Sequence, residues 1–305
     1  MAEVKDHGEP DFSVPPKSPR RDARGARTPR IEVSDGALIP GKGEKPALSA
    51  WRISFFGAIL LLLFLSTRHW VIPFLDRLTG LDLTSFFRIP DPDPYWQIIK
   101  FIPDGILRTL QVTILSIFFS FFVGLITGIG RISRIVVVNR IATIYVEIIR
   151  GIPLLVQIFY IYYALAKVIQ VPDITAAVIA MTVCYGAYLG EIFRAGIQSI
   201  SKGQMEAAIA LGLTRGQALG RIILPQTMRV VLPPLGNEFI ALLKDSSLVS
   251  ILAVSDLLRR GREYASVSFA YFQSYTVVAL VYLVMTLFFS RLVAIMEERL
   301  NRRGR

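Results

Sequence analysis

The sequence predicts an all-α integral membrane protein that crosses the bilayer six times. Hydrophobic residues make up 53% of the 305 residues, and the mean hydropathy is +0.51. A typical soluble protein is only about 45–50% apolar even when glycine is counted. Several uncharged runs approach or exceed the roughly 20 residues that a helix needs to cross the hydrocarbon core. The charged residues gather between these runs, as is typical of a membrane protein.

The first hundred residues divide into a tail, a helix and a loop. Residues 1–50 are rich in proline and in charges of both signs, so we expect a disordered basic cytoplasmic tail, either solvated or near anionic lipid headgroups. Residues 51–75 are uncharged from 53 to 67, and we expect them to form an additional N-terminal transmembrane helix, beyond the five spans that follow it. Residues 76–104 contain acidic residues, Asp-Pro pairs and aromatics, which favour an extracytoplasmic loop at the membrane interface.

Further spans follow the order of the uncharged runs. We expect them at 109–130, 151–166, 174–190, 230–254 and 265–290. The second and fourth of the six spans contain Gly124-x-x-x-Gly128 and Gly186-x-x-x-Gly190, a spacing that lets another helix approach closely.

The fifth span is unusual because it contains ionisable residues. Glu238, Lys244 and Asp245 lie within 230–254, and a charge near the centre of a membrane helix costs about 2.5–3.5 kcal/mol on insertion scales. We therefore expect these side chains to face protein or water.

Between the fourth and fifth spans lies a polar helix-turn-helix segment. Met205, Ala208, Ile209 and Gly212 follow the spacing i, i+3, i+4 and i+7, which predicts a short helix with a small apolar face available for docking. Gly212 is expected to end this helix as the residue beyond its C-cap, with φ > 0. Thr214 and Gln217 have the form of a capping box, so a second short helix should begin there and end before Pro225.

Several function classes are disfavoured by composition. The net charge of +11 would suit nucleic acid, but a DNA-reading helix-turn-helix belongs to a soluble domain, and this one lies between membrane-length runs. The single cysteine, Cys184, cannot form an intrachain disulfide, and with two histidines in the chain we expect no metal site. No phosphate-binding Gly-x-x-x-x-Gly-Lys loop occurs, so any ATP hydrolysis must belong to another chain. We expect no catalytic residues and no cofactor in this chain.

The helix-turn-helix segment resembles the cytoplasmic coupling loop of ATP-binding-cassette (ABC) importer permeases. The shared pattern is Glu206-Ala-Ala, Gly212, Ile222 and Leu224-Pro225 at matching spacing. Further stretches resemble permeases for polar amino acids of the histidine, glutamate, glutamine and arginine type. These stretches are Arg150-Gly-Ile-Pro-Leu-Leu-Val-Gln157, Tyr188-Leu-Gly-Glu-Ile-Phe-Arg-Ala-Gly-Ile197 and Lys244-Asp-Ser-Ser-Leu248. The resemblance covers residues 105–297, a five-helix permease core with its coupling loop at 200–226, and leaves 298–305 as a basic cytoplasmic tail.

The resemblance implies a permease subunit that translocates a polar amino acid across the cytoplasmic (inner) membrane without being an enzyme itself. Hydrolysis of ATP would belong to two copies of a separate ATP-binding subunit that dock on the Glu206–Pro225 loop. A second permease chain, identical or paralogous, and a periplasmic or extracellular amino-acid-binding protein complete the implied assembly, with membrane lipid around it and no nucleic acid. The residues implied for ATPase coupling are Glu206, Ala207, Ala208, Gly212, Leu213, Thr214 and Pro225.

Polar residues at membrane depth are the candidates for the substrate pathway. They are Gln157, Tyr188, Glu191, Asp245 and Ser246, and they could contact the zwitterion of an amino acid near the middle of the membrane. A structural alternative remains open, in which Glu191 pairs with Arg194 and Asp245 with Lys244 only to neutralise one another.

The distribution of Lys and Arg predicts the orientation. The segments 131–140, 194–229 and 291–305 hold three, five and five basic residues, against three, one and three in 76–104, 167–173 and 256–264. With ten more in the first 52 residues, the positive-inside rule places both termini and the coupling loop in the cytoplasm. Arg259, Arg260 and Arg262 argue against this assignment.

Two other classes of function have less support in the sequence. A membrane-embedded enzyme could use Glu191, Glu238 and Asp245 as acid and base, but no metal motif or nucleophile motif accompanies them. A passive channel would have no use for a coupling loop.

Overall fold

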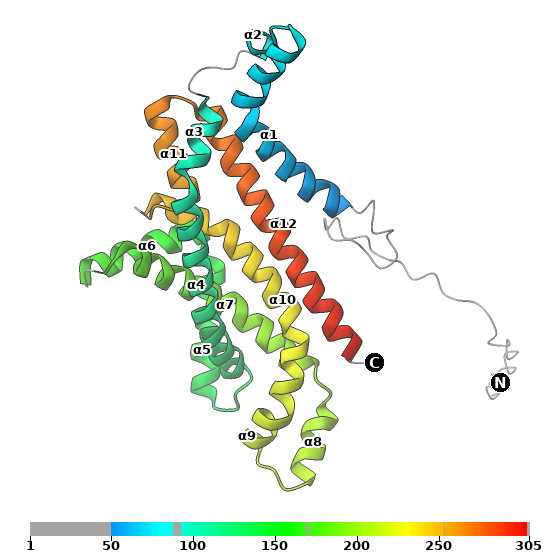
Figure 1. Cartoon of the computed structure of the whole chain (residues 1–305). Coiled ribbons are helices and arrows are strands. Elements are labelled where there is room, and N and C mark those ends of the chain that lie inside the picture. Colours follow the sequence, from blue (N-terminus) through cyan, green and yellow to red (C-terminus); the bar gives the residue numbers. More distant parts are fainter. Residues whose placement is uncertain (1–49, 88–92, 169–170, 253, 304–305) are drawn as a thin grey trace, which may run out of the picture. The chain divides into compact units, whose positions relative to one another are not determined.

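The computed structural model describes residues 50–87, 93–168, 171–252 and 254–303, and all of them belong to one compact unit, Ala37–Arg305. Within this part of the chain every regular element is a helix (Figure 1). The predicted tail, residues 1–49, lies outside the described residues. The helices are α1 Ala50–Thr79, α2 Leu83–Phe87, α3 Pro94–Phe101, α4 Pro103–Arg131, α5 Val136–Gly151, α6 Leu154–Val168, α7 Asp173–Ser199, α8 Lys202–Ala210, α9 Arg215–Ala218, the π-helical turn η1 Leu219–Ile223, α10 Leu224–Asp245, the 3-10 helix η2 Ser246–Ile251, α11 Leu257–Ser268 and α12 Tyr271–Arg303.

Among the described residues, four helices are long and apolar enough to cross a membrane: α1, α4, α7 and α12. α5 and α6 together make a fifth candidate, bent by 112°. The third span, expected at 151–166, therefore corresponds mainly to α6, which begins just after the bend. Ile152, between these two helices, has extended backbone (φ −108°, ψ 138°), because the ring of Pro153 disfavours the helical conformation in the residue before it.

Three further boundaries differ from the expectations. The predicted loop 76–104 contains α2 and α3, with Asp93 capping α3 by accepting a hydrogen bond from the Tyr95 amide at 2.9 Å. The predicted sixth span is interrupted at Phe269, which has φ 58° between α11 and α12. α12 then continues to Arg303, so the predicted basic tail is largely an extension of that helix.

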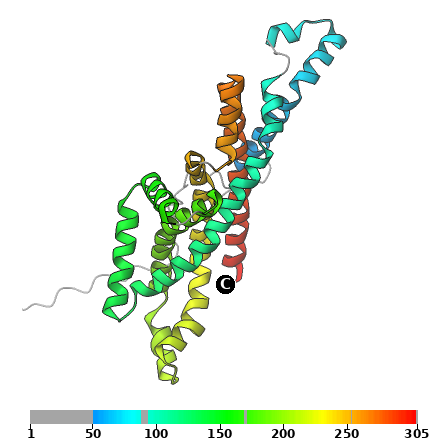
Figure 2. The same cartoon turned by 90° about the vertical axis from the view of Figure 1, so that its left-hand side faces the viewer.

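The core of the unit lies along α7, whose closest neighbour is α4 (Figures 1 and 2). A methyl group added at Gly124 would lie 2.5 Å from Leu189 Cβ, and one added at Gly128 would lie 2.6 Å from Phe193 Cβ. On the facing helix, a methyl group at Gly190 would lie 2.9 Å from Thr127 Cγ2. These approaches confirm that the small-residue spacing brings another helix into close contact.

α1 is attached to α12 and α3 by a few large side chains. The Trp51 indole donates a hydrogen bond to the Leu287 carbonyl at 3.0 Å, and Leu65 is buried with residues of α3 and α12. One turn further along, Arg68 Nε donates to Asp93 Oδ2 at 2.7 Å and Nη2 to Oδ1 at 2.9 Å. The rest of α1 exposes large apolar side chains, as suits a helix that faces lipid.

Candidate functional site

The α8–α9 segment has the helix ends that its sequence predicts. The Leu213 amide donates to the Ala208 carbonyl at 3.1 Å and the Gly212 amide to the Ile209 carbonyl at 2.9 Å. Gly212 has φ +84°. This is the Schellman arrangement, in which glycine is favoured because it carries no penalty for a left-handed backbone. The predicted positive φ at Gly212 is confirmed.

The capping box also forms. The Gln217 amide donates to Thr214 Oγ1 at 3.4 Å, and the Thr214 amide donates to Gln217 Oε1 at 3.0 Å. The second short helix, α9, ends at Ala218, before Pro225 as expected, but the chain stays helical through η1 into α10. Pro225 lies in the first turn of α10, where a missing amide hydrogen costs least. The α8–α9 segment is thereby continuous with α10.

The face of α8 that points away from the chain differs from the predicted docking face. Ala208 is only 1% exposed, and Met205 is half-buried beside Ile223. Glu206 and Ala207 are exposed, and Leu211 is 80% exposed. Met205 and Ala208, which were predicted to face a partner, therefore pack α8 against its own chain. The accessible surface is formed by Glu206, Ala207 and Leu211.

Glu191 is surrounded by guanidinium groups from separate helices. It pairs with Arg194 of the same helix at 2.9 Å, with Arg131 at the end of α4, and with Arg150 near the end of α5 at 3.8 Å. The pairing with Arg194 that the structural alternative expected is present. Because Arg131 and Arg150 join it, the Glu191 carboxylate ties together the ends of α4 and α5 and the middle of α7.

Asp245 has a different partner from the one expected. The Tyr185 hydroxyl donates to Asp245 Oδ2 at 2.8 Å. Lys244 is exposed, and among the described residues no ion pair joins it to Asp245. Consecutive residues of a helix point about 100° apart and cannot face each other, so the proposed pairing of Asp245 with Lys244 is wrong.

The tyrosines of α7 connect these two centres. The ring centroids of Tyr185 and Tyr188 lie 5.9 Å apart, and the Arg150 guanidinium lies 5.6 Å from the centre of the Tyr188 ring. A run of polar contacts therefore leads from Glu191 through Arg150, Tyr188 and Tyr185 to Asp245. We call these five residues the polar track.

The other two pathway candidates are engaged with the backbone. The Ser246 hydroxyl donates to the Leu243 carbonyl at 2.8 Å. The Gln157 amide donates to the carbonyls of Ile149 and Ile152, and so braces the break between α5 and α6. Its Oε1 atom is buried without a hydrogen-bond partner among the described residues.

Sequence reasoning missed Tyr185 and Arg131. Tyr185 lies one turn before Tyr188 on the same face of α7, a signal that was available. Arg131 entered the sequence analysis only through the count of basic residues in 131–140. Chemically, the guanidinium, carboxylate and phenol groups of this region can hold both charges of a zwitterion. Among the described residues no group of three or more potential ligands could hold a metal ion.

Comparisons with known proteins agree with this architecture. The family described as binding-protein-dependent transport system inner membrane component matches residues 120–302. The probable amino-acid permease protein YxeN of Bacillus subtilis is 39% identical over 198 residues, covering 64% of this chain and 88% of YxeN. The glutamine transport system permease protein GlnP of Escherichia coli K12 is 36% identical over 209 residues, covering 68% of this chain and 95% of GlnP.

Solved structures extend the likeness to three dimensions. The crystal structure of an amino acid ABC transporter with histidines contains a chain that is 40% identical, with a TM-score of 0.62 over 67% of this chain and 95% of that one. An inward-facing MetNI methionine ABC transporter shares the fold at 24% identity, with a TM-score of 0.56 over 66% of this chain. The chain is an all-α membrane protein, and it belongs to the family of binding-protein-dependent transport system inner membrane components.

Proposed function

We propose that this chain is the permease subunit of an ABC importer that carries a polar amino acid across the cytoplasmic membrane. The observation that carries the proposal is the near-complete match to amino-acid permeases, which extends over 88% of YxeN and 95% of GlnP. The exposed, glycine-terminated α8 supports it, because such a short helix is suited to a groove on another protein. The amino acid is translocated by the assembly, and ATP is hydrolysed by a partner subunit.

The partners follow from the same reading. Two ATP-binding subunits dock on the Glu206–Pro225 loop, one on each of two permease chains, and an extracytoplasmic binding protein delivers the amino acid. Glu206, Ala207 and Leu211 form the contact surface on α8. Ala208, Gly212, Leu213, Thr214 and Pro225 shape the backbone that presents this surface. Both termini lie in the cytoplasm, as the positive-inside rule predicts.

The polar track is the proposed substrate pathway. The α-carboxylate of the substrate would replace the Glu191 carboxylate as the ion-pair partner of the Arg150 guanidinium. The α-ammonium of the substrate would approach the Asp245 carboxylate. Ionisable groups inside a membrane protein commonly line such pathways, and here they meet through side chains of α5, α7 and α10. Gln157 and Ser246 shape the surrounding backbone.

Reconstitution tests the function. The chain is purified with its partner ATPase and binding protein, incorporated into vesicles and supplied with radiolabelled standard amino acids and L-cystine. We expect accumulation of at least one polar amino acid only when ATP is inside with the ATPase. Equal uptake without ATP would indicate a passive channel, and chemical conversion of the amino acid would indicate an enzyme.

The pathway is tested by Glu191→Gln and Tyr185→Phe. We expect both variants to assemble but to lose most uptake or to change substrate preference. Tyr145→Phe is the matched control, because the Tyr145 hydroxyl donates to a backbone carbonyl, that of Val183, at 2.6 Å. Equal losses in Tyr185→Phe and Tyr145→Phe would mean that Tyr185 has only a structural role.

Orientation is tested by labelling single added cysteines from outside intact cells. A cysteine at Leu81 should react and one at Gln217 should not. The native Cys184 is buried and gives little background. Labelling of the residue-217 variant from outside would contradict the topology.

A further inference from the structure

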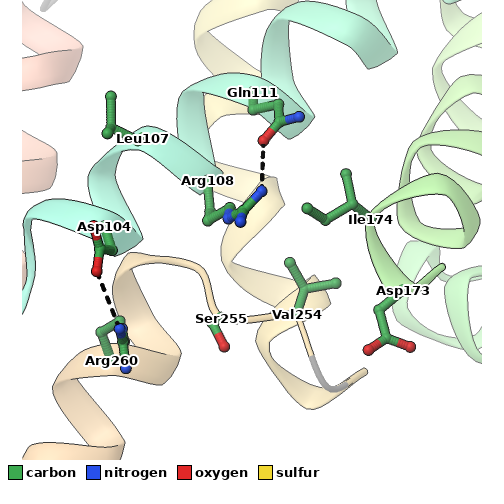
Figure 3. Close-up of a pocket in the computed structure, with 9 residues that line it drawn as sticks. All are labelled: Asp104, Leu107, Arg108, Gln111, Asp173, Ile174, Val254, Ser255 and Arg260. Atoms are coloured by element: carbon green, nitrogen blue, oxygen red, sulfur yellow. Dashed lines mark hydrogen bonds and ion pairs between the residues drawn. The ribbon is translucent and has the colours of Figure 1, made fainter.

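A cavity of about 620 Å³ lies where the first turns of α4 and α7 meet the segment between η2 and α11 (Figure 3). Pockets that bind small molecules usually measure about 300–1,000 Å³, so an amino acid fits within it. The cavity shares no residue with the polar track.

The cavity lies at the opposite end of α7 from the coupling segment. α7 has 27 residues and is therefore about 40 Å long, with Asp173 in the cavity wall at its start and α8 following its other end. The segments that lead into the cavity walls, 76–104, 167–173 and 256–264, together hold seven basic residues, against thirteen in 131–140, 194–229 and 291–305. In the proposed topology the cavity is thus on the side from which substrate arrives.

Some charged side chains of the cavity form ion pairs with other side chains, and others do not. Arg260 Nη2 pairs with Asp104 Oδ2 at 3.3 Å, and Arg260 Nη1 also pairs with Glu263 at 3.3 Å. Arg108 instead donates to the neutral Gln111 Oε1 at 3.0 Å (Figure 3). Asp173 Oδ1 accepts a hydrogen bond from the Tyr162 hydroxyl at 3.0 Å.

Within the described residues neither Arg108 nor Asp173 forms an ion pair, although both line the same cavity. A metal cation in this space would meet the Arg108 guanidinium, and a simple anion would meet the Asp173 carboxylate. One unpaired charge of each sign is complementary to a zwitterion, whose two charges form charge-assisted hydrogen bonds with opposite partners. The apolar side chains of Leu107, Ile174 and Val254 complete the wall.

We propose that this cavity is an outer binding site for the free amino acid, in which Arg108 binds the α-carboxylate and Asp173 binds the α-ammonium. It receives the substrate before the substrate reaches the polar track. The inference rests on the proposed function, because it takes the cargo to be an amino acid, and it adds a second site with its own residues. A site that holds only the backbone charges accepts many side chains, so selection among amino acids belongs elsewhere.

The test measures protection of one position in the cavity wall. Ser255→Cys places a thiol there, and the purified permease–ATPase complex, without binding protein, is labelled with a membrane-impermeant thiol reagent. The chain without this substitution gives the background from the buried Cys184. Each standard amino acid and L-cystine is added in turn. We expect the transported amino acid to slow labelling, and its α-amide and its decarboxylated and deaminated analogues to fail.

Variants assign the charges. In the Ser255→Cys background, Arg108→Gln and Asp173→Asn should each raise the concentration needed for protection at least about tenfold, the effect of losing a hydrogen bond to a charged group. Arg77→Gln and Asp82→Asn are the controls, because both residues are exposed and neither lines the cavity. They should leave protection unchanged.

The outcomes separate this site from the proposed function. Uptake with no protection by any amino acid would overturn the outer site while leaving the importer intact. Protection unaffected by both variants, with uptake reduced, would also overturn it and would identify Arg108 and Asp173 as contacts for the binding protein. Protection without any uptake would support the site and count against the transport reading. If a variant fails to assemble, the comparison of the amino acid with its analogues on the unaltered cavity decides.

Discussion

α4 and α1 are both long apolar helices, but they are joined to their neighbours in different ways. α4 meets α7 through glycines, so that backbone and Cβ atoms lie almost in contact. α1 meets α12 and α3 through the side chains of Trp51, Leu65 and Arg68, and Gly57 within it has no atom within 4 Å of an added methyl group. Where two backbones lie this close, a side chain added at a glycine disrupts the packing of the whole helix pair. Where long side chains make the contacts, one substitution removes only one contact.

The difference in packing between α4 and α1 follows the boundary between the part of the chain that matches the family and the part before it. The family match begins at residue 120, within α4, and continues to 302. Relatives that are matched over 88% and 95% of their length cover only 64% and 68% of this chain. The helix pair that tolerates least change thus lies in the region common to the family, and the loosely attached α1 lies outside it.

Gly124→Val should have the largest effect. Its Cβ would lie 2.5 Å from Leu189 Cβ and 3.0 Å from the Leu189 carbonyl carbon, and overpacking against backbone costs at least about 1–3 kcal/mol. We expect loss of the folded complex in detergent, measured by size-exclusion chromatography. Gly57→Val on α1 is the matched control and should elute as the unaltered chain does. Similar behaviour of the two variants would refute the contrast between the helices.

Gly212→Val tests a glycine that is required for another reason. Nothing lies within 4 Å of an added methyl group, but φ is +84°, a conformation that a β-branched residue adopts only with strain. We expect the chain to insert normally while copurified ATPase and uptake are lost. Gly212→Asn should retain part of both, because asparagine tolerates this backbone.

Gly216→Val provides the comparison for that experiment. Gly216 lies in the same segment, also with open space around it, but without a positive φ. It should retain most of the bound ATPase. Normal ATPase binding and normal substrate-stimulated ATP hydrolysis in Gly212→Val would show that this loop is not the coupling element.

Arg68→Gln should loosen α1 and spare the core. It leaves the Asp93 carboxylate, whose side chain is fully buried, without its ion-pair partner, and breaking a buried pair costs about 3–5 kcal/mol. We expect faster hydrogen exchange in α1 and α3, with exchange in α7 and ATP-driven uptake little changed. Arg68→Lys should have a smaller effect because it keeps the charge. Faster exchange in α7 would mean that α1 supports the core directly.

Asp256→Asn should have the smallest effect, visible as a change in pH dependence. Burial raises the pKa of Asp256 to about 6, against the hydrogen bonds from the Arg259 and Leu258 amides that lower it. Because the folded pKa lies above the unfolded value of 3.8, the contribution of this carboxyl to stability is complete below about pH 4 and is lost as the pH rises through about 6.

Thermal unfolding of the unaltered chain should therefore lose a few degrees of Tm between pH 5 and pH 7.5 relative to Asp256→Asn, whose amide can still cap α11. Asp104→Asn, at an exposed carboxyl, should not change this slope. Identical slopes for the unaltered chain and Asp256→Asn would contradict the assignment.

Sequence patterns succeeded where structure is decided locally. The apolar runs of α1, α4, α7 and α12, the left-handed Gly212 and the capping box of Thr214 each depend on residues within a few positions of one another. The break between α5 and α6 was also signalled locally, by Gly151 and Pro153, but the uncharged run around Pro153 was read as one span.

The polar track could not be predicted in the same way. Tyr185 and its partner Asp245 are sixty residues apart in the chain, and Arg131 and Glu191 are equally distant. Only the packing of α4, α7 and α10 determines which of several polar residues meet. The basic residues of α11 differ from the polar track because most of their partners are close in the sequence. Arg259 and Arg260 pair with Glu263, and Arg262 donates to the Ser250 carbonyl at 3.0 Å. These contacts account for arginines that counted against the topology.

The interlocking glycines of α4 and α7 also determine which movements are available to the molecule. Because the two backbones lie almost in contact at these glycines, we expect sliding of α4 along α7 to require the helices to separate first, and we expect the pair to move as one stiff rod. The coupling segment follows directly on α7, and Asp173 marks the rod's far end, about 40 Å away for 27 residues. Under the proposed function, a displacement of α8 would be transmitted along α7 towards Asp173, and any accompanying bending would occur outside this helix pair, for example at the 112° bend between α5 and α6.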